Sequence, residues 1–442
     1  MAIMILFASI MLIIALPGLR RMKSVEGYVT GNRESGGLLV GASLVATIIG
    51  ASSTLGMADL ARTFGGAAFW WLGLGAAGLL LMAWLTVRPL WNLKAISIAD
   101  AVSRLAGRGA GRLTGVVIVL AWTGIIAAQL VAVGSVLSMA AEADPAVVIL
   151  ITGLAVTLYT TIGGQRSVIR TDLVQLVILV VGVLAVFLML AFPGSEADSG
   201  LVLQPLLHAG FDLEKLVFMA VPLLGAYAAG PDMFSRINSA RSVKAARRGL
   251  VWAACVVVCF GALITSLALI SLQISDSGGK NPLLGAVLGV LPQGLVLLFV
   301  LGLVSAMVSS ADTCLLTAGS ILGCELAGVT GLARVRIFVG LTGIIATLLA
   351  LFFRNIIGLM ISSYAVYTAG IASPLVVALV AGKHDRQPRR SWFIAGMIVG
   401  GLCGMASAIF AIPVLVVWGT ASSAIMAGIS LRRKGTEAAQ EA

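Results

Sequence analysis

The stretch "AMVSSADTCL" (Ala306–Leu315) lies within an apolar run that extends from about Leu291 to Leu322. Its polar side chains and one alanine recur at intervals of three and four residues, which places on one helical face Ala306, Ser309, Ser310 and Thr313. Such a face belongs either to a soluble core that tolerates a polar seam or to a membrane helix that carries a binding site. The composition of the whole chain decides between the two.

The chain has 442 residues, of which 60% are hydrophobic and 11% are charged, and its mean hydropathy is +1.08. Soluble domains carry about 25% charged residues, so this chain has too little charge to cover a surface that faces water. Apolar runs of about 18 or more residues recur along its length, which predicts a polytopic helical membrane protein. The runs lack the alternation of barrel strands. The polar face therefore belongs to a membrane helix.

Thirteen membrane spans are predicted, at about 2–18, 37–62, 66–92, 113–141, 146–163, 172–193, 215–231, 249–272, 291–325, 332–353, 357–381, 392–412 and 414–431. With the N-terminus outside, all but four of the 29 Lys and Arg residues lie on the cytoplasmic side. The four exceptions are Arg62, Lys215, Lys280 and Arg354. The largest cytoplasmic cluster follows the seventh span and contains Arg236, Arg241, Lys244, Arg247 and Arg248.

This asymmetry follows the positive-inside rule. It predicts a multi-pass protein of a plasma (bacterial-type inner) membrane, with its C-terminus in the cytoplasm and lipid around it. The net charge of +11 therefore reflects topology and does not indicate nucleic-acid binding. The first span lacks a positive region before it, so we interpret it as an uncleaved anchor rather than a signal peptide. No obligatory protein partner is evident.

Two predicted spans contain residues that weaken a helix. The second contains "TIIGASSTLG" (Thr47–Gly56), and the seventh contains "VPLLGAYAAGPD" (Val221–Asp232). Each opens a set of five spans, at 37–193 and 215–381. Interrupted helices at corresponding positions in two odd-numbered sets indicate a transporter with inverted repeats. The remainder of this single membrane domain is a leading helix and loop (1–36), two C-terminal helices (382–431) and a cytoplasmic tail (432–442).

Oxygen atoms gather around the second and ninth spans. An unwound turn at Gly50 exposes backbone carbonyls, and Ser309 and Ser310 add hydroxyls, which together suit a hard monovalent cation. The alternative is that both serines bond back to carbonyls one turn earlier. Two acids lie in apolar runs, Asp312 and Asp172, and an ionisable residue in a membrane span indicates function. Asp172 also suits the N-cap of its helix, and Asp232 is expected near a cytoplasmic end, solvated or paired with arginine.

Enzymatic chemistry has little support. The chain has five cysteines, all within apolar runs, and its two histidines fall in connecting segments. It contains no metal-ligand spacing and no set of nucleophile, base and acid. We therefore expect a protein that is not an enzyme.

Four motifs resemble one family. "YTTIGGQRSVIRTDLVQ" (Tyr159–Gln175) is similar to the signature of the sodium:solute symporter family, and "GPDMFSRINSARSVKAARRG" (Gly230–Gly249) resembles the basic loop after its sixth core helix. "SLVATIIGASSTLG" (Ser43–Gly56) resembles its broken first core helix, and "SAMVSSADTCLLTAGSIL" (Ser305–Leu322) resembles its eighth. The match runs in order over about 37–381.

The resemblance implies an all-α, LeuT-type fold of two inverted five-helix repeats, with one extra N-terminal and two extra C-terminal helices. It implies a main sodium site formed by the carbonyls of Ala46, Ile49 and Ala306 and the hydroxyls of Ser309 and Ser310. A second site would involve Asp172, Ser309, Asp312 and Thr313. One or two sodium ions are therefore expected, and at Asp312 a second sodium, a proton or an electrostatic helper remain open.

The solute pocket is expected beside the break, outward of the sodium. Its predicted residues are Gly50, Ser52, Ser53, Trp71, Leu72, Ile125, Ile126, Gln129 and Gly225. Such a pocket offers few hydrogen-bond partners, and each unpaired polar group of a sugar or sialic acid would cost about 1–3 kcal/mol. We favour a small amino acid or short carboxylate, with its anionic group at half-helix N-termini near Gly50 and Gly225.

The sequence thus predicts a sodium-coupled secondary active symporter that imports a small organic solute by alternating access. One alternative is a proton-coupled symporter of the same fold, in which Asp172 or Asp312 would titrate. Another is a transporter-like sensor or channel.

Overall fold

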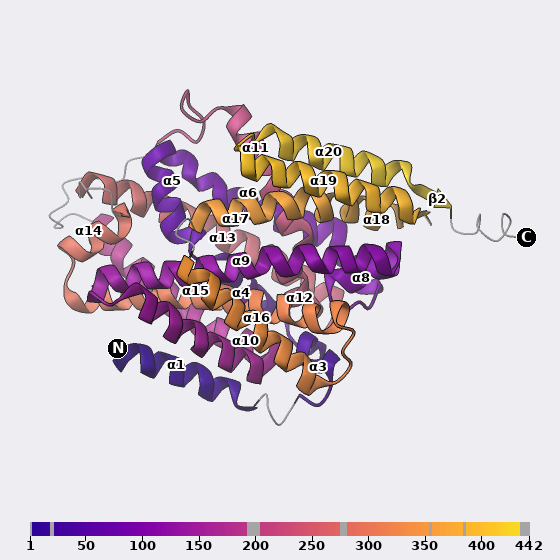
Figure 1. The fold of residues 1–442 in the computed structure, drawn as a ribbon. Helices are drawn as coiled ribbons and strands as arrows, with labels where there is room; N and C mark the ends of the chain where they lie inside the picture. Colours follow the sequence, from indigo (N-terminus) through magenta and orange to yellow (C-terminus); the bar gives the residue numbers. More distant parts are fainter. Residues whose placement is uncertain are drawn as a thin grey trace, which may run out of the picture.

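The computed structural model describes residues 2–17, 22–191, 204–274, 281–352, 356–382 and 386–433. Lys280, Arg354 and most of the predicted tail (434–442) lie outside the described residues. Almost every described element is a helix, and the helices form one bundle (Figure 1).

The elements of the first half are α1 (Ala2–Ala15), α3 (Val25–Thr30), η1 (Gly31–Arg33), α4 (Gly37–Ile48), η2 (Ser52–Gly56), α5 (Met57–Phe64), η3 (Gly65–Phe69), α6 (Trp70–Leu81), η4 (Met82–Thr86), α7 (Val87–Asn92), α8 (Ile98–Ala106), α9 (Arg108–Ala141) and α10 (Pro145–Ala191). Of these, η2 and η4 are π-helical turns.

The elements of the second half are α11 (Leu213–Ala229), α12 (Pro231–Asn238), α13 (Val243–Ile274), α14 (Pro282–Val290), α15 (Gln293–Ile321), η5 (Leu322–Leu326), α16 (Leu332–Phe352), α17 (Ile356–Tyr367), η6 (Thr368–Ala372), α18 (Ser373–Gly382), β1 (Arg386–Pro388), α19 (Arg390–Phe410), α20 (Val414–Ile429) and β2 (Leu431–Arg433). The two strands pair antiparallel, with Arg386 opposite Arg433.

Among the described residues, nine helical segments are long and apolar enough to cross a membrane, and α4 and α20 are shorter apolar helices. The longest segment, α10, covers two predicted spans. A straight helix of its 47 residues would measure about 70 Å, over twice the hydrocarbon thickness of about 30 Å. It is divided at Gly164, whose φ of 62° and ψ of −171° are not helical.

Tyr28 explains why this division requires glycine. A Cβ atom at Gly164 would lie 2.5 Å from a carbon of the Tyr28 ring. The Tyr28 hydroxyl donates to the carbonyl of Thr161, 3.0 Å away. Burial raises the pKa of Tyr28, so the hydroxyl stays protonated and remains a donor. The leading segment thus fixes the bend between the two halves of α10.

Two helices are broken in the middle of the bundle. The first break follows α4, because Ile49 is extended (φ −85°, ψ 98°) and helix resumes only in η2. This break confirms the prediction for the second span. The second break is Gly230 (φ −62°, ψ 141°), after which α12 begins with Pro231. The helix before it, α11, runs without interruption through Pro222 and Gly225.

The position of the second break corrects one expectation. No half-helix begins near Gly225, because α11 continues through this residue. A Cβ at Gly225 would meet the Thr368 side chain, so the glycine permits close packing of α11 on η6. Figure 1 shows α15 in the interior beside α9 and α10, with α19 and α20 together on one edge of the bundle and α1 against α10 on the opposite edge. The central position of α15 places its polar face against both broken helices.

Candidate cation and solute site

The C-terminal end of α4 meets the polar face of α15. The Ser309 hydroxyl donates to the carbonyl of Ala46 at 2.7 Å and to that of Ala306 at 3.0 Å. The Ser310 hydroxyl donates to the carbonyl of Thr47 at 2.9 Å and to that of Ala306 at 3.1 Å. All of these residues are buried. Four of the five residues predicted to bind sodium therefore lie together. The carbonyl of Thr47, which was not among the predicted ligands, belongs to the same group.

The fifth predicted residue, Ile49, is the extended residue at which α4 ends. Its extended backbone conformation turns the carbonyl out of the helical direction. The donor set is made of neutral oxygen atoms from carbonyls and hydroxyls. Unwound backbone carbonyls in broken membrane helices coordinate sodium in transporters, and hydroxyl hydrogens rotate to leave a lone pair for an ion. These residues fit a sodium ion.

Gly50 allows α15 to approach the break. A Cβ atom at this position would lie 2.6 Å from the Ser310 hydroxyl oxygen and 2.9 Å from Oε1 of Gln129. Any larger residue would displace a hydroxyl of the cation site or the amide of α9. The glycine is therefore required by close approach, in addition to its effect on helix stability.

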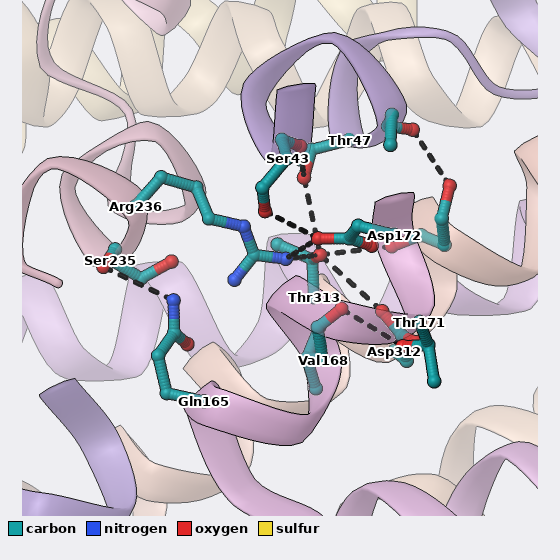
Figure 2. Close-up of polar contacts among 12 residues, drawn as sticks. Ser43, Thr47, Gln165, Val168, Thr171, Asp172, Ser235, Arg236, Asp312 and Thr313 are labelled. Atoms are coloured by element: carbon teal, nitrogen blue, oxygen red, sulfur yellow. Dashed lines mark hydrogen bonds and ion pairs between the residues drawn. The ribbon is translucent and has the colours of Figure 1, made fainter. Parts of the chain in front are cut away.

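A charged cluster lies next to this site (Figure 2). Nη2 of Arg236, on α12, donates to Oδ2 of Asp172, on α10, at 3.0 Å, and also donates to the Thr313 hydroxyl on α15. The Ser43 hydroxyl on α4 donates to the same carboxylate oxygen. Both charged side chains are fully buried. The cluster joins four helices through one ion pair.

Two expectations are corrected here. Asp172 does not cap a helix, because it lies inside α10, eight residues after the bend at Gly164. Arg236 does not belong to the basic cluster expected on the cytoplasmic side, because its side chain is buried and paired with Asp172. The signal was present in the sequence: Arg236 follows five residues after the break at Gly230-Pro231, too close to a mid-membrane break to reach water.

Asp312, the acid of α15, is held by neutral groups. The Tyr159 hydroxyl donates to Oδ2 of Asp312 at 2.7 Å, and the Thr313 hydroxyl lies 3.4 Å from Oδ1. Thr313 also donates to the carbonyl of Ser309 at 2.9 Å. The three residues predicted for a second cation, Asp172, Asp312 and Thr313, are thus brought together, with Arg236 already bonded to two of them.

The half-helix that begins after Gly50 has its first N–H groups bonded. Gly50 N donates to the Ser53 hydroxyl at 2.8 Å, and Ala51 N donates to Oε1 of Gln129 at 2.9 Å. The amide nitrogen of Gln129 lies 3.9 Å from the sulfur of Met360. Two polar residues predicted to contact solute therefore stabilise the break itself. An anionic group at this N-terminus would have to replace these bonds.

Five other predicted solute residues are all buried. They are Ser52 on η2, Trp71 and Leu72 on α6, and Ile125 and Ile126 on α9. Leu72 packs on α13, since a Cβ at Gly261 would lie 3.0 Å from the Leu72 Cβ. The Trp71 indole N–H has no partner among the described residues. It remains available to a polar group of a solute.

A buried carboxylate with tyrosines in its neighbourhood lies at the second break, and the sequence did not indicate this grouping. Asp232, in the first turn of α12, is buried and forms no ion pair among the described residues, although Arg236 acts on it electrostatically. The expectation of a solvated role is therefore wrong, and Arg236 is a neighbouring charge rather than a direct partner. It lies close enough to interact electrostatically with Tyr227, Tyr364 and Tyr367. Tyr227 and Tyr364 have ring centroids 6.4 Å apart.

A further aromatic pair completes this group. Trp122 on α9 packs edge to face on Tyr367 with centroids 4.9 Å apart, and the Tyr367 hydroxyl donates to the carbonyl of Ala229 at 2.6 Å. We call Asp232, Trp122, Tyr227, Tyr364 and Tyr367 the aromatic cluster. The signal in the sequence was the acid directly after Gly-Pro, since Pro at the first helical position with an acid in the first turn marks a new helix N-terminus.

Two broken helices that face a hydroxyl-bearing helix inside a polytopic helical bundle define a secondary transporter. Residues 28–400 match the Sodium:solute symporter family, and the chain belongs to this family. It is a multi-pass membrane protein of a family of sodium-coupled solute symporters, which are transporters rather than enzymes. The number of sodium ions and the solute do not follow from family membership.

Individual relatives agree with this assignment. The chain is 31% identical over 164 residues to the Sodium/iodide cotransporter of Homo sapiens, covering 36% of this chain and 25% of that protein. It is 27% identical over 395 residues to the High affinity choline transporter 1 of Homo sapiens, covering 81% and 68%. It thus spans a quarter of the first relative and about two thirds of the second.

A solved structure shows the same fold. A substrate-bound, outward-open Na⁺-coupled sialic acid symporter superposes with a TM-score of 0.80 at 18% identity, over 97% of this chain and 96% of that one. The all-helical, LeuT-like fold predicted from the sequence is therefore confirmed.

Proposed function

We propose that the chain couples one sodium ion to the import of a small amine-bearing organic solute by alternating access. The observation that carries the sodium site is the pair of hydrogen bonds from Ser309 and Ser310 to carbonyls of the broken helix, at 2.7 and 2.9 Å. In the proposal a sodium ion lies among these oxygen atoms, and the two hydroxyl hydrogens rotate away so that a lone pair of each hydroxyl faces the ion. Its ligands are the carbonyls of Ala46, Ile49 and Ala306 and the hydroxyls of Ser309 and Ser310.

Sodium bound here connects α4 to α15 beside the break at Gly50. Ser53 and Gln129 of α9 accept hydrogen bonds from N–H groups of the same break, so that ordering one side of the break orders the other. Solute and sodium therefore prefer the same conformation of the protein, and each increases the affinity of the protein for the other by the same factor. The membrane potential adds about 2.3 kcal/mol per charge for each 100 mV.

A count of one sodium is supported by Arg236. Its guanidinium bonds both Asp172 and Thr313, two of the three residues predicted for a second cation. A second metal ion would have to displace a fully buried arginine from its ion pair. The charge of Arg236 thus serves in place of a second sodium.

The architecture we propose has two inverted repeats of five helices, at 37–193 and 215–381, a leading helix and two C-terminal helices. The breaks after α4 and α11 support it, since each lies in the first helix of its repeat. We further propose thirteen spans with the N-terminus outside and the C-terminus in the cytoplasm, in a plasma membrane and without an obligatory protein partner. The distribution of Lys and Arg supports this orientation.

The solute class follows from charge. The N–H groups near Gly50 are already bonded, whereas the Asp232 carboxylate lies within electrostatic reach of three tyrosines and forms no ion pair among the described residues. Arg236, the cation that acts on it electrostatically, is already paired with Asp172. A carboxylate beside aromatic faces suits an ammonium group. We therefore favour an amino acid or another amine over a simple carboxylate or a sugar. The choline specificity named for one relative is consistent with this class.

Thermal stability of the purified protein tests the sodium site, measured in sodium and in potassium across amines, amino acids, monocarboxylates, sugars and iodide. We expect sodium to raise the melting temperature of the wild type and one amine-bearing solute to raise it further. Ser309→Ala should lose the sodium effect. Ser305→Ala on the same helix, whose buried hydroxyl has no partner among the described residues, should retain it.

The alternatives have distinct outcomes. A stabilisation that ignores sodium and follows pH would replace the sodium assignment with a proton-coupled transporter. In proteoliposomes, a sodium gradient should drive solute above its external concentration. Dissipation of the sodium gradient without accumulation of solute would indicate a channel, and binding of solute without its uptake would indicate a sensor.

A further inference from the structure

A second cleft shares no lining residue with the candidate cation and solute site. This cleft, of about 950 Å³, opens between α7 with the turn before it and the first turns of α13. Its lining includes four basic side chains and two indoles and no carboxylate. The basic residues are Arg88, Lys244, Arg247 and Arg248, and the indoles are Trp84 and Trp252. None of the four cations forms an ion pair with another described residue. Four cations that lack counter-charges line one cavity.

The cleft is built into the fold. In the π-helical turn η4, Val87 N bonds to the carbonyl of Met82, so the carbonyl of Ala83 is left without its usual helical partner. Nε of Arg247 donates to that carbonyl at 3.0 Å, and its guanidinium lies over the Trp84 ring at 5.0 Å. A single arginine is thus anchored and stacked. Its remaining N–H groups are free to bind a ligand in the cleft.

The opposite wall is fixed as well. A Cβ at Gly41 on α4 would lie 2.7 Å from the Trp252 ring, so the indole lies directly against α4. The other edge of the ring is open, and the side chain of Trp252 is 37% exposed, while that of Trp84 is 62% exposed. In a membrane protein such exposed indoles face lipid at the level of the headgroups.

The position of the cations fixes the chemistry of the ligand. They lie on α7 and on the first turns of α13, where a predicted span begins, and Val251 and Cys255 continue the lining toward the apolar interior of the membrane. A ligand that fits must have an anionic head at the membrane surface and an apolar part below it. Basic pockets of this kind on the cytoplasmic side bind acidic phospholipid headgroups.

We propose that this cleft binds an anionic phospholipid. Its phosphodiester lies among Arg88, Lys244, Arg247 and Arg248, and an acyl chain follows Trp252 and Val251. A free phosphate shares the head chemistry but cannot use the apolar lining. The lipid is the ligand that satisfies both parts of the cleft.

The experiment uses the full-length protein in neutral detergent, with phosphatidylglycerol, phosphatidylcholine or inorganic phosphate added. Native mass spectrometry counts retained lipids, and melting temperature reports stabilisation. The test variant is Arg88→Gln with Arg248→Gln, because both residues are exposed and neither holds a backbone carbonyl. The matched control is Arg108→Gln with Arg112→Gln on α9, which removes the same charge from exposed positions outside the cleft.

We expect wild type and control to retain phosphatidylglycerol over phosphatidylcholine and to be stabilised by it. The test variant should bind it about 30-fold more weakly, since each basic residue contributes about 1 kcal/mol. Loss of the sodium response in the test variant would indicate a general structural defect. The double variant Arg88→Lys with Arg248→Lys, which keeps both charges, is then the test of lipid binding, and it should bind phosphatidylglycerol as wild type does. Equal loss in the control, equal binding of phosphatidylcholine, or an equal shift from phosphate alone would overturn the proposal.

Discussion

The carboxylate of Asp172 and the guanidinium of Arg236 meet at 3.0 Å in the centre of the bundle, although 64 residues separate them along the chain. Neither side chain is exposed to solvent. The pair joins the second half of α10 to the half-helix α12, and Thr313 and Ser43 attach it to α15 and α4. It therefore connects the two broken helices of the transporter.

We expect Asp172→Asn and Arg236→Gln each to lower the free energy of unfolding by about 3–5 kcal/mol, because each leaves an unpaired buried charge. The double variant should lose less than the sum of the two. Unfolding in mixed detergent micelles measures this. The exposed pair Arg104–Asp100 is the control, and Arg104→Gln should cost no more than about 1 kcal/mol. Additive losses in the double variant would show that the two groups do not depend on each other.

Gly164→Ala should destabilise the protein by about 1–3 kcal/mol from its backbone conformation alone, with a further loss from contact with the Tyr28 ring. Melting temperature is the measurement. Gly340→Ala on α16 is the control, because its nearest neighbour would be 3.7 Å away and alanine is the better helix former. A melting temperature for Gly164→Ala equal to that of the control would contradict the assigned bend.

Gly50→Ala should remove the stabilisation by sodium, because the new methyl group would meet the Ser310 hydroxyl and the Gln129 amide. Sodium titration followed by melting temperature tests this directly. Gly294→Ala, at the start of α15 with no atom within 4 Å of its added methyl group, should leave the titration unchanged. An unchanged sodium response in Gly50→Ala would remove the break from the cation site.

Asp232→Asn should weaken an amine-bearing solute by about 10- to 100-fold, corresponding to about 1.5–3 kcal/mol for a hydrogen bond to a charged group. The stabilisation by sodium alone should remain. Solute titration in saturating sodium measures the effect, with Asp59→Asn as the control at an exposed acid outside the aromatic cluster. If the variant loses stability but binds solute with unchanged affinity, the role of Asp232 is only to stabilise the N-terminus of α12.

The wild-type sodium titration should be hyperbolic, with a Hill coefficient near 1, because Arg236 occupies the position of a second cation. Thr313→Val should preserve this shape, since it removes a partner of Arg236 and no ligand of the proposed sodium ion. A coefficient approaching 2 in wild type that returns to 1 in Thr313→Val would establish a second sodium.

Sequence and structure differ most at the charged residues. The hydroxyls of Ser309 and Ser310 were found from helical spacing, because the contacts that matter follow the period of one helix. Arg236 and Asp232 were placed near the cytoplasmic surface, because the seventh span was expected to end at about residue 231. The break at Gly230 moves both residues into the interior.

By itself the sequence determined the membrane character, the polar face of α15 and the break at Gly50, since apolar length, periodicity and glycine act locally along the chain. Only the tertiary structure decided that Arg236 pairs with Asp172, that Gln129 and Ser53 are bonded to the broken backbone, and that Asp232 lies within electrostatic reach of three tyrosines. Each of these contacts joins segments distant in sequence. Burial then makes such polar groups find partners, and which partners are within reach depends on how the helices pack.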